Sequence, residues 1–187
     1  MGLRDFFNSK KSNSGFDPLT DLVLAKLRPG YLVDYAGHTW QVTGYARNDF
    51  GEGYLSEEWE LNSGSETRWL EREDLQREVV WYWSQRLPLG ELGSSIRQHI
   101  RQHEDPPDTL TFADKEYYLE ESGPGYCYEH GREPAQEFIY WSYVNEQDDT
   151  VVTVEQWSET EFAAWLSQPV HEYEFTNILP GADTSLS

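Results

Sequence analysis

Residues 35–42 read Tyr35-Ala36-Gly37-His38-Thr39-Trp40-Gln41-Val42, and residues 112–119 read Phe112-Ala113-Asp114-Lys115-Glu116-Tyr117-Tyr118-Leu119. The two stretches align without gaps, because aromatic falls on aromatic, Ala on Ala and the polar turn on the polar turn. The alignment continues farther along the chain, pairing Tyr54 with Phe138, Trp59 with Tyr143, Leu70 with Val154 and Glu71 with Glu155. A repeat of this size predicts two copies of one small β-rich module.

The secondary structure expected around the repeat is mostly extended. Asp17 as N-cap and Pro18 in the first turn predict a helix that carries Leu19, Leu22, Val23 and Leu27 on one face. Alternating or β-branched and aromatic runs predict strands, Gly123-Pro124-Gly125 predicts a turn, and the helical spacing of apolar residues at 88–104 predicts a connector helix. Residues 161–166 are compatible with a strand or a short helix. The expected strands cover residues 32–35, 39–42, 54–61, 67–70, 79–83, 110–112, 116–119, 137–144, 151–157 and, as a final edge strand, 169–175.

The predicted fold class is therefore mainly β. It comprises two related antiparallel β-modules from an internal duplication, with a short N-terminal helix and a connecting helix. The predicted units are a flexible amphipathic N-terminus (1–16), a first β-module with its leading helix (17–87), a helical connector (88–107), a second β-module (108–181) and a frayed tail (182–187).

The composition places the chain among folded proteins of a reducing compartment. It has 187 residues, of which 37% are hydrophobic and 15% aromatic, which is enough for one sizeable domain or two small ones. Its one cysteine, Cys127, excludes an internal disulfide and a Cys-based zinc cluster. No run of 18 apolar residues indicates a membrane span, and the first residues do not resemble a signal peptide. We expect a cytoplasmic protein.

The charge is strongly acidic and unevenly distributed. The chain has 14 Lys and Arg against 34 Asp and Glu, a net charge of −20, and residues 105–187 alone carry two basic and 18 acidic side chains, a net charge of −16. Such a surface repels phosphate backbones, which argues against nucleic-acid binding. It favours basic proteins, metal cations or polyamines, although the charge can equally serve solubility alone. Because surface charge is screened by salt, we expect any polyamine binding to be weak.

Three groups of residues are candidate chemical sites. His99 and His103, at i and i+4 on the connector helix, have the spacing of two metal ligands, but they lie near the apolar stripe and no third ligand is marked, so packing residues are the favoured interpretation. Cys127, close to His130, has no evident base or oxyanion site and is expected to be a structural cysteine. The pairs Glu57-Glu58 and Glu120-Glu121 lie on strands, where neighbours point to opposite faces, so neither pair can share one ion. No catalytic residue and no cofactor are expected.

Two apolar segments are candidate partner-binding residues. Trp81, Tyr82 and Trp83 are consecutive in a strand, so at least one must lie on the opposite sheet face and contact the other module or a partner. Leu3, Phe6 and Phe7 form one apolar edge beside Arg4, Lys10 and Lys11, the most basic stretch of the chain. That segment is compatible with peripheral contact to an anionic membrane, with docking on a partner, or with an ordinary frayed terminus.

The run from Leu27 to Gly44 resembles the opening of the bacterial domain-of-unknown-function family 4178. Three other segments resemble it as well: Trp69-Leu70-Glu71, residues 110–123 and the ending Ile178-Leu179-Pro180-Gly181. The family supplies no catalytic residues to carry over. The resemblance implies that such proteins are encoded beside small membrane proteins, phage-shock-protein-A-like proteins and polyamine-synthase-like enzymes. It therefore implies an accessory role near the inner membrane.

The functional expectation is a non-enzymatic, acidic binding or accessory protein. It is expected to bind a protein partner in a membrane-associated or membrane-stress system. The alternative is an enzyme or sensor for a cationic small molecule such as a polyamine, which a cleft lined by carboxylates and aromatic rings with perturbed pKa values would favour.

Overall fold

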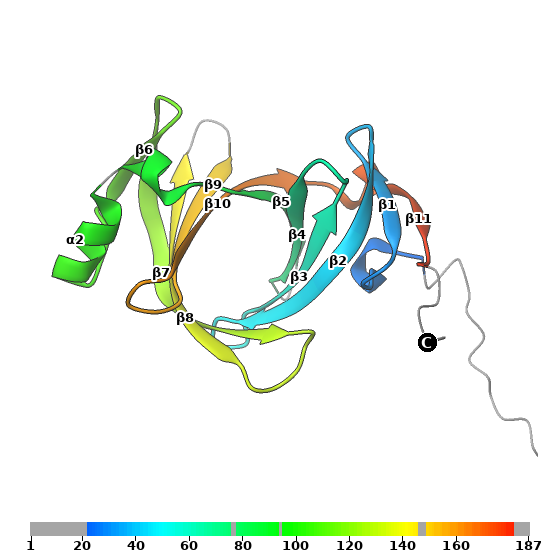
Figure 1. Ribbon diagram of the computed structural model, residues 1–187, viewed down its shortest axis with the longest axis horizontal. Coiled ribbons are helices and arrows are strands. Elements are labelled where there is room, and N and C mark those ends of the chain that lie inside the picture. The colour runs from blue at the N-terminus through cyan, green and yellow to red at the C-terminus, as the bar shows by residue number, and fades with distance from the viewer. Residues whose placement is uncertain (1–21, 76–77, 94, 146–148, 182–187) are drawn as a thin grey trace, which may run out of the picture.

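The computed structural model describes residues 22–75, 78–93, 95–145 and 149–181. In these ranges the chain forms one antiparallel sheet of eleven strands in the order β11-β1-β2-β3-β4-β5-β10-β9-β8-β7-β6 (Figure 1). The mainly β prediction is confirmed, but both expected modules contribute to this one sheet. The strands are β1 (Leu32–Tyr35), β2 (His38–Asp49), β3 (Leu55–Asn62), β4 (Thr67–Asp74), β5 (Val79–Arg86), β6 (Thr109–Phe112), β7 (Lys115–Glu129), β8 (Gln136–Asn145), β9 (Thr150–Gln156), β10 (Phe162–Val170) and β11 (Thr176–Leu179).

A second pairing closes the sheet on itself. The last four residues of β2, Ala46 to Asp49, pair antiparallel with residues 126–129 at the end of β7. The eight strands β2-β3-β4-β5-β10-β9-β8-β7 therefore form a closed ring, which is seen end-on in Figure 1. Strands β1 and β11 extend the sheet beyond β2 on one side, and β6 extends it beyond β7 on the other.

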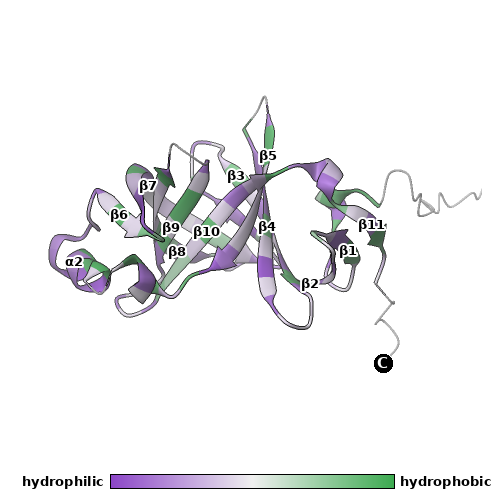
Figure 2. Cartoon of the chain, turned by 90° about the horizontal axis from the view of Figure 1, so that it is seen from above, coloured by the Kyte–Doolittle hydropathy of each residue, from purple (hydrophilic) through white to green (hydrophobic). Residues whose placement is uncertain are grey.

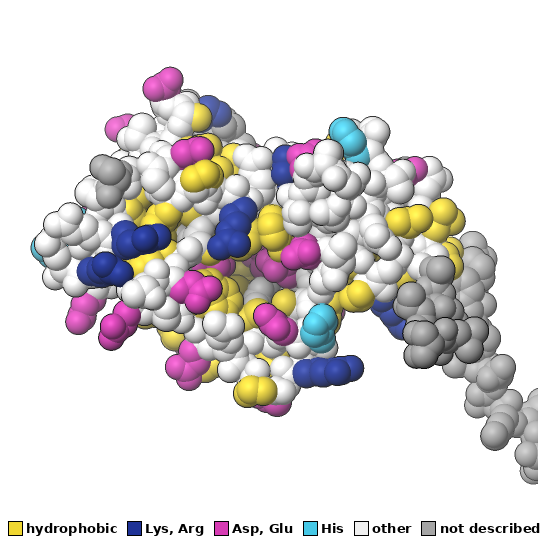
Figure 3. Space-filling model, in the orientation of Figure 1, with side chains coloured by type: hydrophobic (Ala, Val, Ile, Leu, Met, Phe, Trp, Pro, Cys, Tyr) yellow, Lys and Arg dark blue, Asp and Glu magenta, His cyan; other side chains and the backbone are white. Residues whose placement is uncertain are grey.

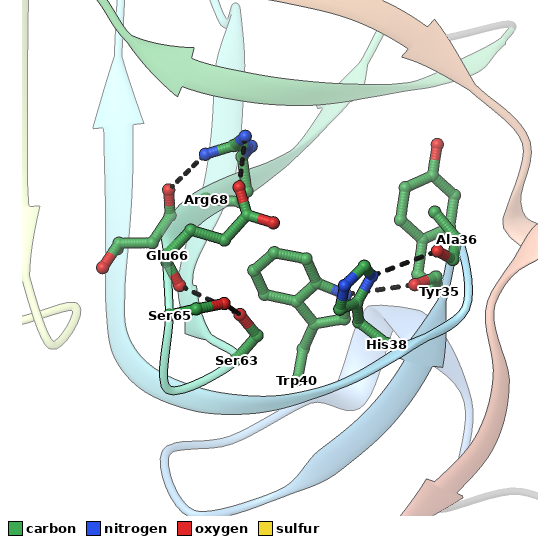
Figure 4. Close-up of polar contacts among 9 residues, drawn as sticks. Tyr35, Ala36, His38, Trp40, Ser63, Ser65, Glu66 and Arg68 are labelled. Carbon is green, nitrogen blue, oxygen red and sulfur yellow. Dashed lines mark hydrogen bonds and ion pairs between the residues drawn. The ribbon is translucent and has the colours of Figure 1, made fainter.

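The two halves of the ring share local features at equivalent places. Each begins with a hairpin whose two turn residues have positive φ: Ala36 and Gly37 in the first half, Ala113 and Asp114 in the second. This is the turn geometry that suits the twist of a two-residue hairpin. Figure 4 shows the first turn, where the Trp40 indole N–H donates to the carbonyl of Tyr35 (3.1 Å).

The strand order and the register irregularities also correspond. The order is β1 to β5 in the first half and β6 to β10 in the second. The register shifts between Val42 and Gly44 in β2, and at the aligned place between Leu119 and Glu121 in β7. In the ladders Leu70 pairs with Trp59 and Val154 pairs with Trp141, whereas the alignment sets Trp59 against Tyr143. Tyr143 therefore lies two residues from the place that the alignment assigned to it.

Two hydrophobic cores lie on the outside of the ring, one for each half. The first core packs η1 (Leu24–Lys26) against β1–β5, with Trp59 and Leu61 fully buried, and the Trp59 indole N–H donates to the carbonyl of Leu27 (2.9 Å). The second packs η2 (Leu89–Leu92) and α2 (Ile96–His103) against β6–β10. Since strand residues alternate between faces, the polar residues between these apolar ones face the interior of the ring. Figure 2 shows hydrophobic and hydrophilic residues interspersed along the ring strands.

The structure differs from the sequence expectation in three segments. The predicted helix from Asp17 is limited, in the described residues, to the short η1, and the connector consists of η2 and α2 instead of one helix. Residues 162–170 form a strand, and the final edge strand is β11, because residues 172–174 form the short helix η3. Gly123-Pro124-Gly125 is not a turn but lies inside β7, beyond its pairing with β6 and before its pairing with β2, so the missing N–H of Pro124 removes no ladder bond on that side.

Candidate functional site

The interior of the ring contains an acidic cavity of about 80 Å³. Five carboxylates line it, together with the rings of Phe50, Tyr54, Phe138, Tyr140 and Trp165 and several small polar side chains. Figure 3 looks along the ring and shows Asp and Glu side chains gathered at the hollow in the middle of this face. The five carboxylates belong to Glu58, Glu71, Glu73, Glu121 and Glu155.

Strand alternation brings these carboxylates together from four strands. On β3, Trp59 points to the outer core while Glu58 points inward, and its ladder partner on β4 is Glu71. Glu73 follows on the same face of β4, two residues on, or about 6.7 Å along the strand. Glu121 directly follows the register shift in β7, and Glu155 lies on β9 on the opposite wall of the ring.

Neutral donors hydrogen-bond three of the five carboxylates. The Ser56 hydroxyl donates to Glu71 (2.6 Å), the Tyr140 hydroxyl to Glu121 (2.8 Å) and the Trp157 indole N–H to Glu155 (2.9 Å). The Tyr54 side chain lies near Glu73 and opposes the rise of its pKa. Glu58 differs from these four, because no donor acts on its carboxylate and no hydrogen bond or ion pair joins it to any residue that the structure describes.

Burial raises the pKa values of Glu58, Glu71, Glu73 and Glu155, and the charges of neighbouring carboxylates add to this rise for the first three. For Glu58 burial has the largest effect and the charges of Glu71, Glu155 and Glu60 add to it, so its pKa lies well above the ordinary value. The pKa of Glu71 is raised to about 8 by burial and by Glu73, against the opposing hydrogen bond from Ser56. Burial also raises the pKa of Glu73 and of Glu155. This environment favours protons on the carboxylates with raised pKa values, and a nearby cation would favour their release.

The aromatic wall depends on one glycine of β7. Gly123 and Gly125 lie opposite Tyr140 and Phe138 in the ladder, and the missing Cβ atom of Gly125 lets the Phe138 ring lie across the strand. A Cβ on Gly125 would come within 2.4 Å of the Phe138 ring. Phe50 packs edge-on against Tyr140, with ring centroids 5.0 Å apart. Aromatic rings therefore line the cavity together with the carboxylates.

A recess of about 270 Å³ adjoins the cavity and shares Glu58 with it. Cys127, Glu129 and His130 line this recess at the end of β7, so Cys127 lies on a strand and not in a loop. Burial, followed by the charge of Glu58, raises the pKa of the Cys127 thiol to about 12. The thiol is therefore protonated near neutral pH, which makes it a poor nucleophile.

The comparisons with known proteins place the chain in a family. The family described as domain of unknown function DUF4178 matches residues 28–172, most of the chain.

The chain belongs to the DUF4178 family.

A relative of this DUF4178 protein occurs in Aquifex aeolicus (strain VF5), where it is described as an uncharacterized protein. The two are 28% identical over 172 residues, which is 92% of this chain and 93% of the relative. No solved structure matches the chain. In the described part of this DUF4178 protein, no helix has both the length and the apolar character needed to cross a membrane.

The site candidates from the sequence lie away from the cavity or only partly at it. His99 and His103 lie on α2, outside the ring; their rings are 4.4 Å apart, His103 is exposed, and Nδ1 of His99 is 2.8 Å from the carbonyl oxygen of Asp105. Across the described ranges, no group of three or more His, Cys, Asp or Glu side chains has the arrangement of a metal site. Leu3, Phe6 and Phe7 lie outside the described residues.

The aromatic run of β5 divides between the two faces, as its spacing requires. Trp81 and Trp83 are buried in the outer core, at 5% and 8% exposure, whereas Tyr82 lies on the inner face of the ring. Burial, with the charges of Glu73 and Glu71, raises the pKa of Tyr82 to about 12. The three side chains therefore serve the core and the interior of this DUF4178 protein, and offer no exposed aromatic patch.

The cavity itself was not predicted from the sequence, although its signal is present. The argument that Glu57 and Glu58 point to opposite faces is confirmed, since Glu57 is on the outer face with Arg72 (3.2 Å). The same alternation places Glu58 on the inner face of the ring, where Glu71 and Glu155 line the same cavity. Glutamates at every second position, at 58 and 60 and at 71 and 73, alternate with buried Trp59 and Leu70 and are the available signal.

The raised pKa values predict how stability depends on pH. A carboxyl group whose pKa rises from 4.5 to about 8 on folding stabilises the protein below pH 4.5, and this contribution is lost as the pH rises through 8. The free energy of unfolding of the ligand-free protein should therefore fall as the pH rises from about 4.5 to about 8. Glu71→Gln should reduce this fall by about 1–3 kcal/mol, given about 1.4 kcal/mol per pKa unit and some solvent screening.

Urea unfolding at several pH values measures this effect. Glu137→Gln is the matched control, because Glu137 is exposed on β8 beside the inward-facing Phe138 and the substitution removes the same charge. Equal pH profiles for Glu71→Gln and the unsubstituted protein would contradict the assignment.

Proposed function

We propose that this protein is a non-catalytic binding protein for a small organic cation, an alkylamine or a polyamine end, held in the inner cavity. The observation that carries the proposal is the carboxylate of Glu58, which faces the cavity without a donor while four further carboxylates surround it. Buried carboxylates are normally paired, because an uncompensated charge in a poorly solvated site is costly. An ammonium group is the partner that this arrangement lacks.

The aromatic rings favour an organic cation over a bare metal ion. Phe50, Tyr140 and Trp165 present ring surfaces to the same space as the carboxylates, and ring faces attract alkylammonium groups. The carboxylates are spread along the strands and do not converge on one point. The adjoining recess at Glu58 gives an extended alkyl chain room to leave the cavity.

Binding without catalysis is favoured by the chemistry of the same residues. The Cys127 thiol, with a pKa of about 12, is protonated, and a thiol needs to be ionised to attack a substrate. The carboxyl groups with raised pKa values can instead exchange protons for a ligand cation. Affinity for the cation should consequently increase as the pH rises toward 8.

Calorimetry in physiological salt tests the proposal with three probes: butane-1,4-diamine, butylamine and the neutral analogue butane-1,4-diol. The amines should give saturable binding at one site and the diol none. Glu58→Gln should weaken amine binding by roughly tenfold or more, as expected for a hydrogen bond to a charged group. Glu137→Gln, with the same loss of charge on the outer face, should leave the affinity unchanged.

The competing explanation is loose attraction of amines to an acidic surface. In that case binding would be unsaturable, would disappear with added salt, and would weaken equally in Glu58→Gln and Glu137→Gln. This outcome would remove the cavity as the binding site.

A second candidate function, partner-protein binding, is favoured by a groove on the outside of the second half. The groove has a volume of about 470 Å³ and includes Tyr126 and Ile139, which are 39% and 44% exposed. Glu137 and Glu159 also line it, so it suits a basic segment with apolar side chains. The proposed inner-membrane association of such a complex rests on residues 1–11 and on the family resemblance.

Substitution tests the groove. Ile139→Ser should abolish capture of a basic, apolar peptide while leaving amine binding in the cavity intact. Unchanged peptide binding would contradict the docking proposal.

We also propose that the two halves derive from one duplicated five-stranded unit. Supporting observations are the common strand order, the two hairpin turns with positive φ and the aligned register shifts at 42–44 and 119–121. A sequence profile built from relatives of residues 31–86 should match residues 108–170 with Trp59 opposite Trp141. A match in another register, or none, would contradict the duplication.

A further inference from the structure

We propose that Arg86 is a tethered counter-ion, whose guanidinium competes with a bound cation for the Glu155 end of the inner cavity and so sets which cations bind tightly. The inference rests on the proposed function, since it requires a cation in the cavity. It is carried by the position of Arg86 over the ring of Trp165, which lines the same cavity.

The sheet register places Arg86 on the inner side of the ring. Arg86 is the last residue of β5 and lies directly opposite Trp165 of β10. Side chains directly opposite each other in a ladder point to the same face, and Trp165 lines the cavity. The guanidinium carbon of Arg86 is 5.7 Å from the centroid of the Trp165 ring, so the cation lies over that ring.

Arg86 differs from Arg47 and Arg72 in facing the interior of the ring without a hydrogen bond or ion pair to a described residue. Arg47 stacks on Tyr128, and Arg72 pairs with Glu57, on the outer face. The guanidinium of Arg86 is exposed and makes no hydrogen bond or ion pair with any of the described residues. Figure 3 shows a Lys or Arg side chain beside the acidic hollow.

The charge of Arg86 acts on Glu155. Glu155 of β9 lies opposite Ala163 of β10, which is two residues along β10 from Trp165. Burial raises the pKa of Glu155, and Trp165, Trp157 and Arg86 oppose that rise. The indole N–H of Trp165 faces Glu155 without reaching hydrogen-bond geometry, which leaves it without an acceptor in the described chain. Arg86 thus partly compensates the carboxylate that it faces across the Trp165 ring.

A competitor of this kind affects ligands according to their charge. A positive charge about 10 Å from the bound ammonium, at an effective dielectric constant between protein and water, changes affinity roughly three- to tenfold. A second ammonium group on the ligand meets the same repulsion, so a diamine should be disfavoured more than a monoamine. Displacing Arg86 is easy, because its guanidinium has no hydrogen bond to break.

The test measures affinities of butylamine and butane-1,4-diamine for Arg86→Gln, Arg86→Lys and Arg97→Gln. Arg97 is the matched control, an exposed arginine lying 5.5 Å over the ring of Phe162 but outside the ring of strands. Arg86→Gln should tighten butylamine binding roughly three- to tenfold and diamine binding more. Arg86→Lys should resemble the unsubstituted protein, and Arg97→Gln should change neither affinity.

A ligand-free measurement separates this inference from the proposed function. Carboxyl NMR titration should show a higher pKa for Glu155 in Arg86→Gln than in the unsubstituted protein. If the unsubstituted protein binds amines saturably but Arg86→Gln changes neither the affinities nor the Glu155 titration, the role of Arg86 is overturned and cation binding stands. If no variant binds an amine, both proposals fail.

Discussion

The pairing of residues 46–49 with residues 126–129 is the constraint on which the rest of the molecule depends. It joins the two halves edge to edge and turns an open sheet into a ring. Only in a ring do Glu71 on β4 and Glu155 on β9 face each other across a common space. On an open sheet the same carboxylates would be hydrated on a solvated face, with ordinary pKa values and no reason to bind a cation tightly.

The ring reverses the usual placement of polar and apolar side chains. Its interior contains carboxylates and hydroxyls, and its two apolar cores lie outside, where Trp59 and Trp141 are fully buried beneath η1 and near α2 respectively. Burial of a large apolar side chain stabilises a fold by about 1.5–3 kcal/mol, so two such cores can offset the cost of crowding carboxylates. Because the two are separate, interior side chains can change with little effect on the packing that maintains the fold.

Local features of the fold were predictable from the sequence, and features set by distant contacts were not. The hairpins at Ala36-Gly37 and Ala113-Asp114 and the strand at 79–86 follow from turn residues and β propensity. The glycines of β7 give a turn signal, but Gly125 makes room for the ring of Phe138, which comes from another strand. A gap-free alignment does not reveal that Trp141, and not Tyr143, pairs with Val154 in the sheet.

The candidate site shows the same limit. Adjacent glutamates point to opposite faces, as expected, so the two members of such a pair do not share one ion. Whether an inner series of glutamates is solvated or enclosed depends on ring closure, which joins residues about 80 positions apart. Likewise, the inward position of Arg86 follows only from its pairing with Trp165 in the ladder.

The long separation of the closing strands has a kinetic consequence. Hairpins such as β1–β2 bring together residues that are close in sequence, whereas closing the ring requires two finished halves to meet, which carries a larger loop-closure entropy. We therefore expect the halves to form first and the β2–β7 seam to form last. Until then both seam edges are unpaired and the glutamates are hydrated, so an ammonium ion that binds only the closed ring would slow its reopening and act on the lifetime of the native state.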